Sequence, residues 1–478
     1  NSPDINKTLA GGFPTQLPVP SAHPSSLLRP PQQLRTNSPP ITVFAPDMKL
    51  PTVHEWNVGL QRELPWGLVA QAGYIGRRGQ TLFMAYDINQ VNPDKIIPSF
   101  LIMQQNRAKG CTPSGTGCPA GVTGVAPPLL SQLQTQGGLT ATAAASFLNS
   151  STTTNELDIN GAGSFARRIE DNTLGLKLRP NQQFALITYL DNSGDSNYHA
   201  AQFTLRRRFS TGLGLSMAYT FGKSIDNQSV DPVGASSGGG LSTTNSRTPT
   251  EIRDFREERA RSDFDRTHAL TAASVWEVPV GKGRRYFANA PGVVNHILGG
   301  WSINTIYTHM SGEPFAVRSG AFTSNGSHES RAGVQGPVTA QLQELSGSPL
   351  AGPVLFKPVN ALTCGVDLNQ PFCIPAPGQN GAGRNIFIAP SYWNVDFGFV
   401  KMFQITERVK VQFRTEMFNA FNHTNFDNPR DASTGSPSIR SSVFASSCCA
   451  AVAPPSTQTI VQTGEAARVI QFALKFQF

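Results

Sequence analysis

The sequence of 478 residues contains few charges and no long apolar run. Only 15% of its residues are charged, against about 25% in an ordinary soluble domain. No uninterrupted apolar stretch approaches the ~18 residues that a transmembrane helix requires. Gly and Pro number 44 and 36, which argues against a helical bundle or an α/β enzyme because both residues disfavour element interiors. A membrane protein of this composition would have to cross the bilayer as β-strands.

The sequence also lacks a convincing catalytic, metal or nucleic-acid motif. Gly234-Ala-Ser-Ser-Gly238 matches G-x-S-x-G, but it lies in a Gly/Ser tract and not between a strand and a helix. None of the eight histidines stands four residues from another, so a helical metal-binding pair is absent. The net charge of +8 is diffuse, and no interleaved aromatic residues accompany Arg206–Arg208. We therefore predict no enzymatic activity, no cofactor or metal, and no nucleic-acid partner.

The six cysteines lie in close pairs. Cys111 and Cys118 form one pair and Cys364 and Cys373 another, both within Gly/Pro-rich segments. An even number of cysteines at such spacing favours disulfides in an oxidising compartment. The adjacent pair Cys448-Cys449 would form a strained bond, and its state is left open.

Nine segments alternate apolar and polar residues with a period of two, the pattern of strands with two different faces. Most approach the length of about 9–11 residues that crosses a bilayer when tilted. A soluble β-sandwich would show the same alternation. Aromatic residues near many segment ends favour a membrane barrel, as in interfacial girdles. The segments are Val53–Gln61, Leu68–Ile75, Ala200–Phe209, Leu213–Gly222, Ala269–Val278, Trp301–Thr308, Tyr392–Lys401, Val411–Met417 and Ile470–Phe478.

The connections between these segments alternate between short and long. The long ones cover 77–195, 223–266, 318–391 and 422–466. Short turns on one side and long loops on the other are typical of outer-membrane barrels. We predict an all-β fold: the C-terminal portion of an antiparallel transmembrane β-barrel, with about 9–10 visible strands and long extracellular loops.

The chain divides into two parts. Residues 1–51 contain eleven prolines and are interpreted as an extracellular loop or linker, and 52–478 as barrel strands with their loops. A C-terminus on the short-turn side places the start of Val53–Gln61 on the opposite side. Because a closed bacterial barrel has an even number of strands, we expect at least one further strand upstream.

Polar residues on the faces opposite the apolar ones would line the barrel lumen. They are the candidates for contact with a ligand or a plug. Their alternative role is an ion network that satisfies itself inside the wall. The candidates are Glu55, Gln61, Arg206, Arg208, Glu277, Asp396, Arg414 and Glu416.

Glu251–Arg266 is the most charge-dense segment of the chain. We expect it to be a solvated loop whose charges neutralise one another. The functional alternative is an external loop that binds anionic lipopolysaccharide or a ligand.

Several strand motifs together resemble one family. These are Thr52–Leu64, Asn197–Phe203, Ala218–Asn227, Ser262–His268, Gly299–Ile303, Phe413–Phe426 and Gln471–Phe478. As an ordered set over about residues 40–478, they are similar to the C-terminal barrel of Oar-like TonB-dependent receptors. These receptors carry a carboxypeptidase-regulatory-like domain and are abundant in Acidobacteria.

The resemblance implies a Gram-negative outer-membrane protein of roughly twenty-two strands that takes up a large solute. TonB would be a partner only with the N-terminal plug, which this sequence does not contain. The alternatives are a processed surface protein that makes extracellular contacts or polymers, and a component of protein export.

The last strand resembles the signal that the barrel-assembly machinery recognises. Phe472, Phe476 and the terminal Phe478 stand at alternate positions, with mostly polar residues between the apolar ones. Such an amphipathic edge strand can add to another sheet. The bilayer with its lipopolysaccharide and this machinery are therefore the expected partners, and self-assembly through edge strands is a further possibility.

Overall fold

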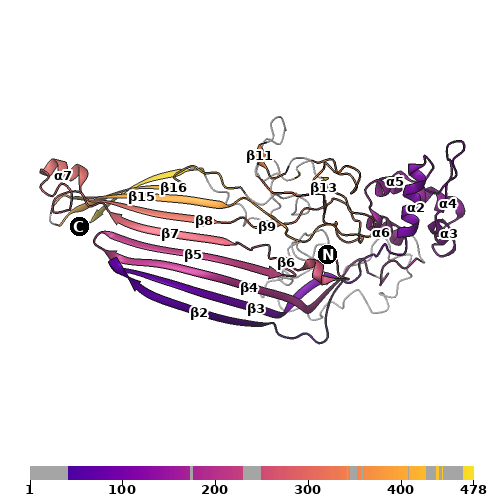
Figure 1. The fold of residues 1–478 in the computed structure, drawn as a ribbon, viewed down its shortest axis with the longest axis horizontal. Coiled ribbons are helices and arrows are strands. Elements are labelled where there is room, and N and C mark those ends of the chain that lie inside the picture. Colours follow the sequence, from indigo (N-terminus) through magenta and orange to yellow (C-terminus); the bar gives the residue numbers. More distant parts are fainter. Residues whose placement is uncertain are drawn as a thin grey trace, which may run out of the picture.

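The computed structural model is an elongated molecule with strands at one end and a folded layer of loops at the other (Figure 1). It describes residues 41–172, 176–182, 184–229, 249–341, 343–344, 353–356, 359–406, 408–426, 438–440, 444 and 467–477. We use "wall" for the main sheet. The "loop layer" comprises the described residues of 88–186, 227–267, 311–391 and 438–444.

The wall contains the nine predicted strands in sequence order, each antiparallel to the next, and the barrel prediction is confirmed. The order along the sheet is β17-β16-β15-β8-β7-β5-β4-β3-β2, with β2 and β17 at its two edges. The strands are β2 (Thr52–Leu64), β3 (Leu68–Asp87), β4 (Ile187–Ser210), β5 (Leu213–Asp226), β7 (His268–Glu277), β8 (Trp301–Met310), β15 (Tyr392–Gln404), β16 (Lys410–Phe418) and β17 (Val469–Gln477).

Short turns join strands at the end of the wall that lies far from the loop layer. The 3₁₀ turn η3 (Pro65–Gly67) joins β2 to β3. Between β4 and β5 only Thr211 and Gly212 intervene, with φ of 49° and 84°. Positive φ at both central residues is the geometry that matches the twist of a two-residue hairpin, and Gly212 adopts it without strain.

β3 and β4 are longer than the alternation predicts. β3 continues to Asp87 and β4 begins at Ile187, so both extend into the segment 77–195 that was expected to be loop. The register between them shifts near Leu82, an irregularity that bends a strand pair. β1 (Ile41–Phe44) pairs in parallel with the start of β4. In this extension the adjacent residues Met84 and Ala85 are both buried, so the alternation with a period of two is lost and the pattern did not reveal it.

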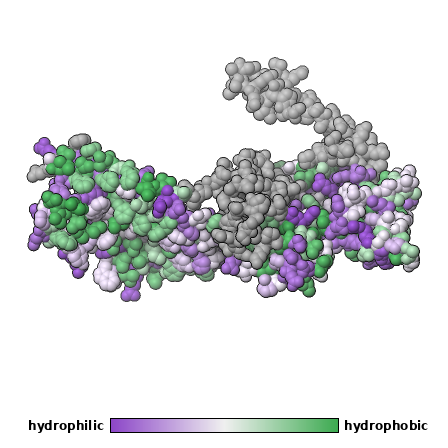
Figure 2. Space-filling view, turned by 90° about the horizontal axis from the view of Figure 1, so that it is seen from above, coloured by the Kyte–Doolittle hydropathy of each residue, from purple (hydrophilic) through white to green (hydrophobic). Residues whose placement is uncertain are grey.

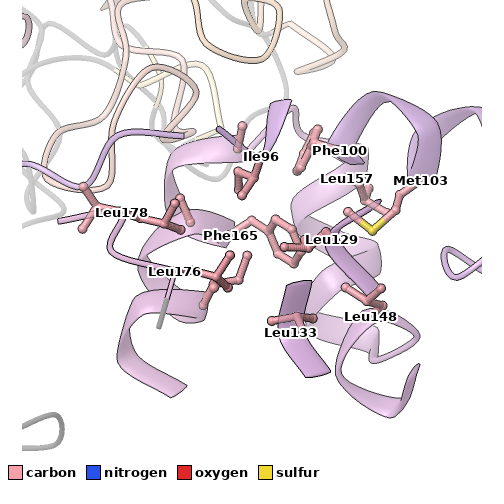
Figure 3. Packing of buried hydrophobic residues seen from close by; sticks show 14 of the residues in the cluster. Ile96, Phe100, Met103, Leu129, Leu133, Leu148, Leu157, Phe165, Leu176 and Leu178 are labelled. Atoms are coloured by element: carbon pink, nitrogen blue, oxygen red, sulfur yellow. The ribbon is translucent and has the colours of Figure 1, made fainter. Parts of the chain in front are cut away.

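The same segment also contains five helices, which the sequence analysis did not predict. They are α2 (Ile97–Ala108), α3 (Pro128–Thr135), α4 (Ala141–Leu148), α5 (Ser151–Asp158) and α6 (Ala162–Asn172). Their apolar side chains form one core, in which the rings of Phe100 and Phe165 lie 5.8 Å apart. Figure 3 shows Leu129 and Phe165 meeting between the helices. We call α2–α6 the helical unit.

The rest of the loop layer packs around phenylalanines. Phe315, Phe356, Phe372 and Phe387 are buried together, and the rings of Phe356 and Phe372 lie 4.9 Å apart. Short pairs brace this core: β9 (Pro314–Phe315) with β14 (Phe387–Ile388), β10 (Gly333–Val334) with β13 (Phe372–Cys373), and β11 (Gln343–Glu344) with β12 (Pro353–Val354). β6 (Ala260–Arg261) adds to β5. The loop layer thus has two hydrophobic cores of its own.

The two faces of the wall differ in chemistry. One face carries the cross-strand row Phe203, Tyr219 and Leu270, and many of its large apolar side chains are exposed. Figure 2 shows hydrophobic residues gathered over the strand-bearing end of the molecule. Among the described residues, the structure contains no helix long and apolar enough to cross a membrane. The apolar face of the wall is the surface suited to lipid.

Candidate functional site: the lumen face and the loop layer

The register places the predicted lumen residues on the face opposite the apolar one. Gln61 pairs with Gln71, which pairs with Thr204 on β4, and the row continues in the same way across the sheet. On β15 and β16, Gly398 pairs with Glu416 and Val400 with Arg414. Arg208 lies inside the register shift between Arg207 and Ser210, and it has no assigned partner on β5. The side chains on this face are small or polar over most of the sheet.

The acidic candidates are held locally. Glu55 accepts a hydrogen bond from Arg77 Nε at 2.8 Å, and Arg284 Nη2 lies 3.0 Å from Glu277 Oε2. Asp396 accepts the backbone N–H of Asn419 at 2.9 Å.

The remaining contacts are also between neighbours. Gln471 donates to Glu416, and Arg414 Nε donates to Gln412 at 3.1 Å. Within the described residues, none of the eight candidates forms an ion pair with another of the eight. The structure spreads them from β2 to β16 and does not bring them into one site, so they line the wall individually.

The loop layer contains a buried ion pair that the sequence analysis missed. Glu258, at the end of η5 (Phe255–Glu258), is 1% exposed and lies 2.9 Å from Arg331 Nη1. The Thr250 hydroxyl donates to the same carboxylate at 2.7 Å. Burial alone would raise the pKa of Glu258, but the Arg331 guanidinium and Thr250 hold that pKa below its ordinary value. The pair joins two loops that are far apart in sequence.

A second buried arginine ties the loops to the wall. The Arg384 guanidinium pairs with Asp226, the last residue of β5, and lies 3.2 Å from Asp263. Its Nε donates to the backbone oxygen of Glu258 at 2.9 Å. Because removing one partner of a buried pair leaves an uncompensated charge, these contacts fix the loop layer on the strand ends.

The expectation that Glu251–Arg266 is solvated is therefore wrong for several of its residues. Glu251, Glu258, Ser262 and Asp265 are all buried. Glu251 pairs with Arg253 and Asp265 with Arg261 inside the segment. The burial of Glu258 does not show in the sequence because Arg331 and Arg384 reach this residue from 73 and 126 residues away. Arg331 and Arg384 stand in loops with few acidic residues nearby. Such arginines were the available sign that a carboxylate elsewhere in the chain would pair with them.

His328 lies in the same region and is fully buried. Burial, together with the nearby Arg318 charge, lowers the pKa of His328 to about 3. Its backbone N–H donates to Asn325 at 2.8 Å. His328 is therefore neutral at physiological pH.

The helical unit joins the rest of the loop layer through hydrogen bonds to backbone carbonyls. The Asn160 side-chain amide donates to the Pro375 carbonyl at 2.9 Å, and the Gly163 backbone N–H donates to the Phe322 carbonyl at 2.8 Å. A shallow concavity of about 220 Å³ lies at this junction. It is lined by Ser164, Arg167, Arg168, Asp171, Asn172, Phe322 and Gly326.

Two disulfides close loops in this layer: Cys111–Cys118 in the helical unit and Cys364–Cys373 beside the phenylalanine core. Other sequence features lie outside the described residues, namely the Gly234–Gly238 motif, Cys448, Cys449 and Phe478. Phe472 and Phe476 lie on the apolar face of β17 and are exposed.

The chain matches the family described as outer membrane beta barrel domain over residues 1–471. No curated protein matches the sequence. Among similar solved structures are the outer membrane transporter YddB of Escherichia coli (8% identity, 92% of this chain and 34% of that chain, TM-score 0.36) and the ferric yersiniabactin uptake receptor FyuA of Yersinia pestis (7%, 80% and 27%, 0.28). A mutant of the ferric enterobactin receptor PfeA of Pseudomonas aeruginosa is also similar (9%, 89% and 31%, 0.32).

This chain spans about a third of the length of those three proteins or less. The family match covers nearly all of its residues, and the nine antiparallel strands with one apolar face fit that match. The chain belongs to the outer membrane β-barrel domain family, and its place is the outer membrane of a Gram-negative bacterium.

Proposed function

We propose that the chain forms part of the wall and the outer loops of a TonB-dependent receptor that takes up a large solute. The ordered strand motifs that resemble Oar-like receptors support this proposal. The layout supports it too, since short turns are periplasmic and long loops extracellular in outer-membrane barrels. The loop layer then faces the outside of the cell.

The observation that carries the proposal is that the outer loops are folded and anchored. Glu258 and Arg331 pair inside the loop layer, and Arg384 joins that layer to β5. A rigid loop surface above a polar lumen can hold a large solute at the entrance with little ordering cost on binding. The helical unit enlarges that surface with its own core.

The wall also requires further strands. β2 and β17 end the strand order, and β2 is exposed along its whole length. Unpaired backbone groups in lipid each cost several kcal/mol, about as much as any uncompensated buried polar group. We therefore propose that strands beyond this sheet close the barrel, consistent with a plug-bearing receptor of which this chain is a portion.

The exposed edges also favour an alternative, which is pairing between copies in a surface assembly. A cysteine at Val58 on β2 and another at Phe472 on β17 would distinguish the two. If further strands complete the barrel, they separate the two positions and no cross-link forms between them. Links between polypeptides support a polymer, and a link within one polypeptide would mean that these nine strands close on themselves, which would contradict the proposed further strands. The apolar face of β17, with Phe472 and Phe476, is in addition the surface that we assign to the barrel-assembly machinery.

Uptake can be tested although the solute is unidentified. Untargeted mass spectrometry would compare the growth medium of cells that carry the complete gene, cells that lack it, and cells that lack TonB. The proposal predicts that one large solute is depleted by the first cells and by neither of the others. Three identical depletion profiles would contradict energised uptake by this protein.

A further inference from the structure

The connection between β7 and β8 is the longest at the short-turn end and has its own fold. A turn over 279–288 is closed by hydrogen bonds between Gly281 and Tyr286 at 2.9 Å and between Tyr286 and Pro279 at 3.0 Å. The helix α7 (Gly292–Leu298) follows. Figure 1 shows α7 at the far left, beyond the ends of the strands. We call residues 279–300 the α7 hairpin.

The α7 hairpin exposes apolar side chains that its own fold does not cover. Val293 is 74% exposed and Ile297 63%, and none of the residues of α7 is buried. Tyr286 and Phe287 in the preceding turn are exposed as well. A short helix with uncovered apolar residues in water requires a partner surface.

The apolar face of the wall holds the end of α7. Trp301, the first residue of β8, donates its indole N–H to the Ile297 carbonyl at 2.9 Å. Lys401 on β15 pairs in register with Trp301 and donates to the Gly299 carbonyl. Lys401 is only 2% exposed, so the α7 hairpin covers a charge that stands on the lipid face. The negative end of the helix suits that ammonium group.

The chain reverses at Gly300 to make this contact. Gly300 has φ of +71°, and a Cβ there would lie 2.9 Å from the Met402 carbonyl oxygen. The side chain of Asn295 accepts the Lys282 N–H at 2.7 Å and fixes the turn against α7. The α7 hairpin is therefore continuous with the membrane-facing surface and fixed to it.

The charge of the α7 hairpin has one sign. Lys282, Arg284 and Arg285 are exposed, and residues 279–300 contain no Asp or Glu. Arg284 is engaged by Glu277, whereas no carboxylate among the described residues forms an ion pair with Lys282 or Arg285. Basic groups beside exposed apolar ones are the combination that binds an anionic membrane surface.

We propose that the α7 hairpin is an interfacial membrane anchor. Its apolar side chains insert into the periplasmic leaflet of the same bilayer that the barrel crosses, and Lys282 and Arg285 bind phosphate groups of anionic lipids. Lys401 and Trp301 set the depth and direction of the anchor. This role is independent of whether the receptor takes up a solute.

The test uses the full chain purified from outer membranes, with Cys448 and Cys449 replaced by serine. An environment-sensitive fluorophore is attached to Ile297→Cys, and the protein is reconstituted with phosphatidylethanolamine, phosphatidylglycerol and doxyl-labelled lipid. The matched control is Phe264→Cys in the loop layer, because Phe264 is 62% exposed. We expect about a twofold loss of fluorescence at position 297, since an interfacial helix lies ~5–10 Å into the headgroup boundary.

The control position should show no quenching. Equal quenching by doxyl lipid at positions 297 and 264 would overturn the anchor. It would mean that the α7 hairpin points into water or contacts a protein.

The charges are tested separately with Lys282→Gln/Arg285→Gln. Both proteins carry the label at Ile297→Cys. Adding phosphatidylglycerol should increase the quenching of the parent protein, and most of this increase should be absent in the variant. In vesicles of phosphatidylethanolamine alone, the two should be quenched alike. Quenching of the parent that does not change with phosphatidylglycerol would contradict the phosphate contacts.

Discussion

The wall and the loop layer obey different rules. The wall exposes apolar side chains on one face and carries polar ones on the other, and its contacts join neighbouring strands. The loop layer buries apolar side chains and also buries charges such as Glu258 and Arg331. Lipid surrounds the first region and water the second. The wall therefore keeps polar side chains away from lipid, and the loop layer keeps apolar side chains away from water.

The comparison predicts that a lost buried charge damages the loop layer alone. Arg331→Met leaves Glu258 buried without its cation, at a cost of about 3–5 kcal/mol. Trypsin applied to intact cells should then cleave the loop layer rapidly, while the heat-modifiable gel migration of the wall stays unchanged. Arg256→Met removes an arginine that pairs with Asp254 at the surface and is the control. Equal cleavage of both variants would mean that the Glu258–Arg331 pair does not hold the layer.

A charge on the lipid face should damage the wall alone. Met217 lies on the apolar face of β5, and the next residue, Ala218, lies on the lumen face. Met217→Arg should cost about 2–4 kcal/mol near the bilayer midplane and abolish heat-modifiable migration, whereas Ala218→Arg should preserve it. The assignment of the two faces would be wrong if the two variants behaved alike.

The helical unit should depend on its disulfide. Cys111 and Cys118 are expected to resist alkylation until a reductant is added. Replacing both by serine should destabilise the helical unit by about 2–3 kcal/mol, as the unfolded chain gains freedom. Hydrogen exchange would then rise over α2–α6 and stay unchanged in the wall. Free alkylation of Cys111 in untreated protein would contradict the disulfide.

Acid should loosen the loop layer before the wall. Because burial and the Arg318 charge lower the pKa of His328 to about 3 from 6.5, His328 binds a proton more readily in the unfolded chain. Its contribution to stability is complete above pH 6.5 and is lost as the pH falls toward 3. At pH 5.5 the loss is about 1.4 kcal/mol, and protease sensitivity should report it. His328→Gln should flatten this dependence, and an unchanged profile would exclude His328 as its source.

The wall could be predicted from the sequence because lipid imposes a local rule. Alternate residues meet the same solvent, so segments such as Leu213–Gly222 reveal both strand and facing without distant partners. The predicted segments are shorter than β3 and β4, because adjacent residues such as Met84 and Ala85 are both buried there and the alternation is lost. The prediction placed Glu55 and Glu416 on one face but could not show that they stand at opposite sides of the sheet.

The loop layer could not be predicted in the same way because its contacts are distant in sequence. Arg384 meets Asp226, and Asn160 meets Pro375. Some helical signals were local and were missed: Thr140 and Ser150 cap α4 and α5 through their side-chain oxygens. The spacing of Phe100 and Met103 is also that of a helix face. The abundance of Gly, Ser and Thr in the segment obscured both.

The most direct test of the two-solvent account is a nitroxide scan along β5. Single spin labels at positions 213–222 in the reconstituted protein would be measured for collision with oxygen, which dissolves in lipid, and with a water-soluble nickel chelate. The account predicts oxygen accessibility that alternates with a period of two and is high at Leu215, Met217 and Tyr219. Accessibility without alternation, or high nickel accessibility at those three residues, would contradict a lipid-facing wall.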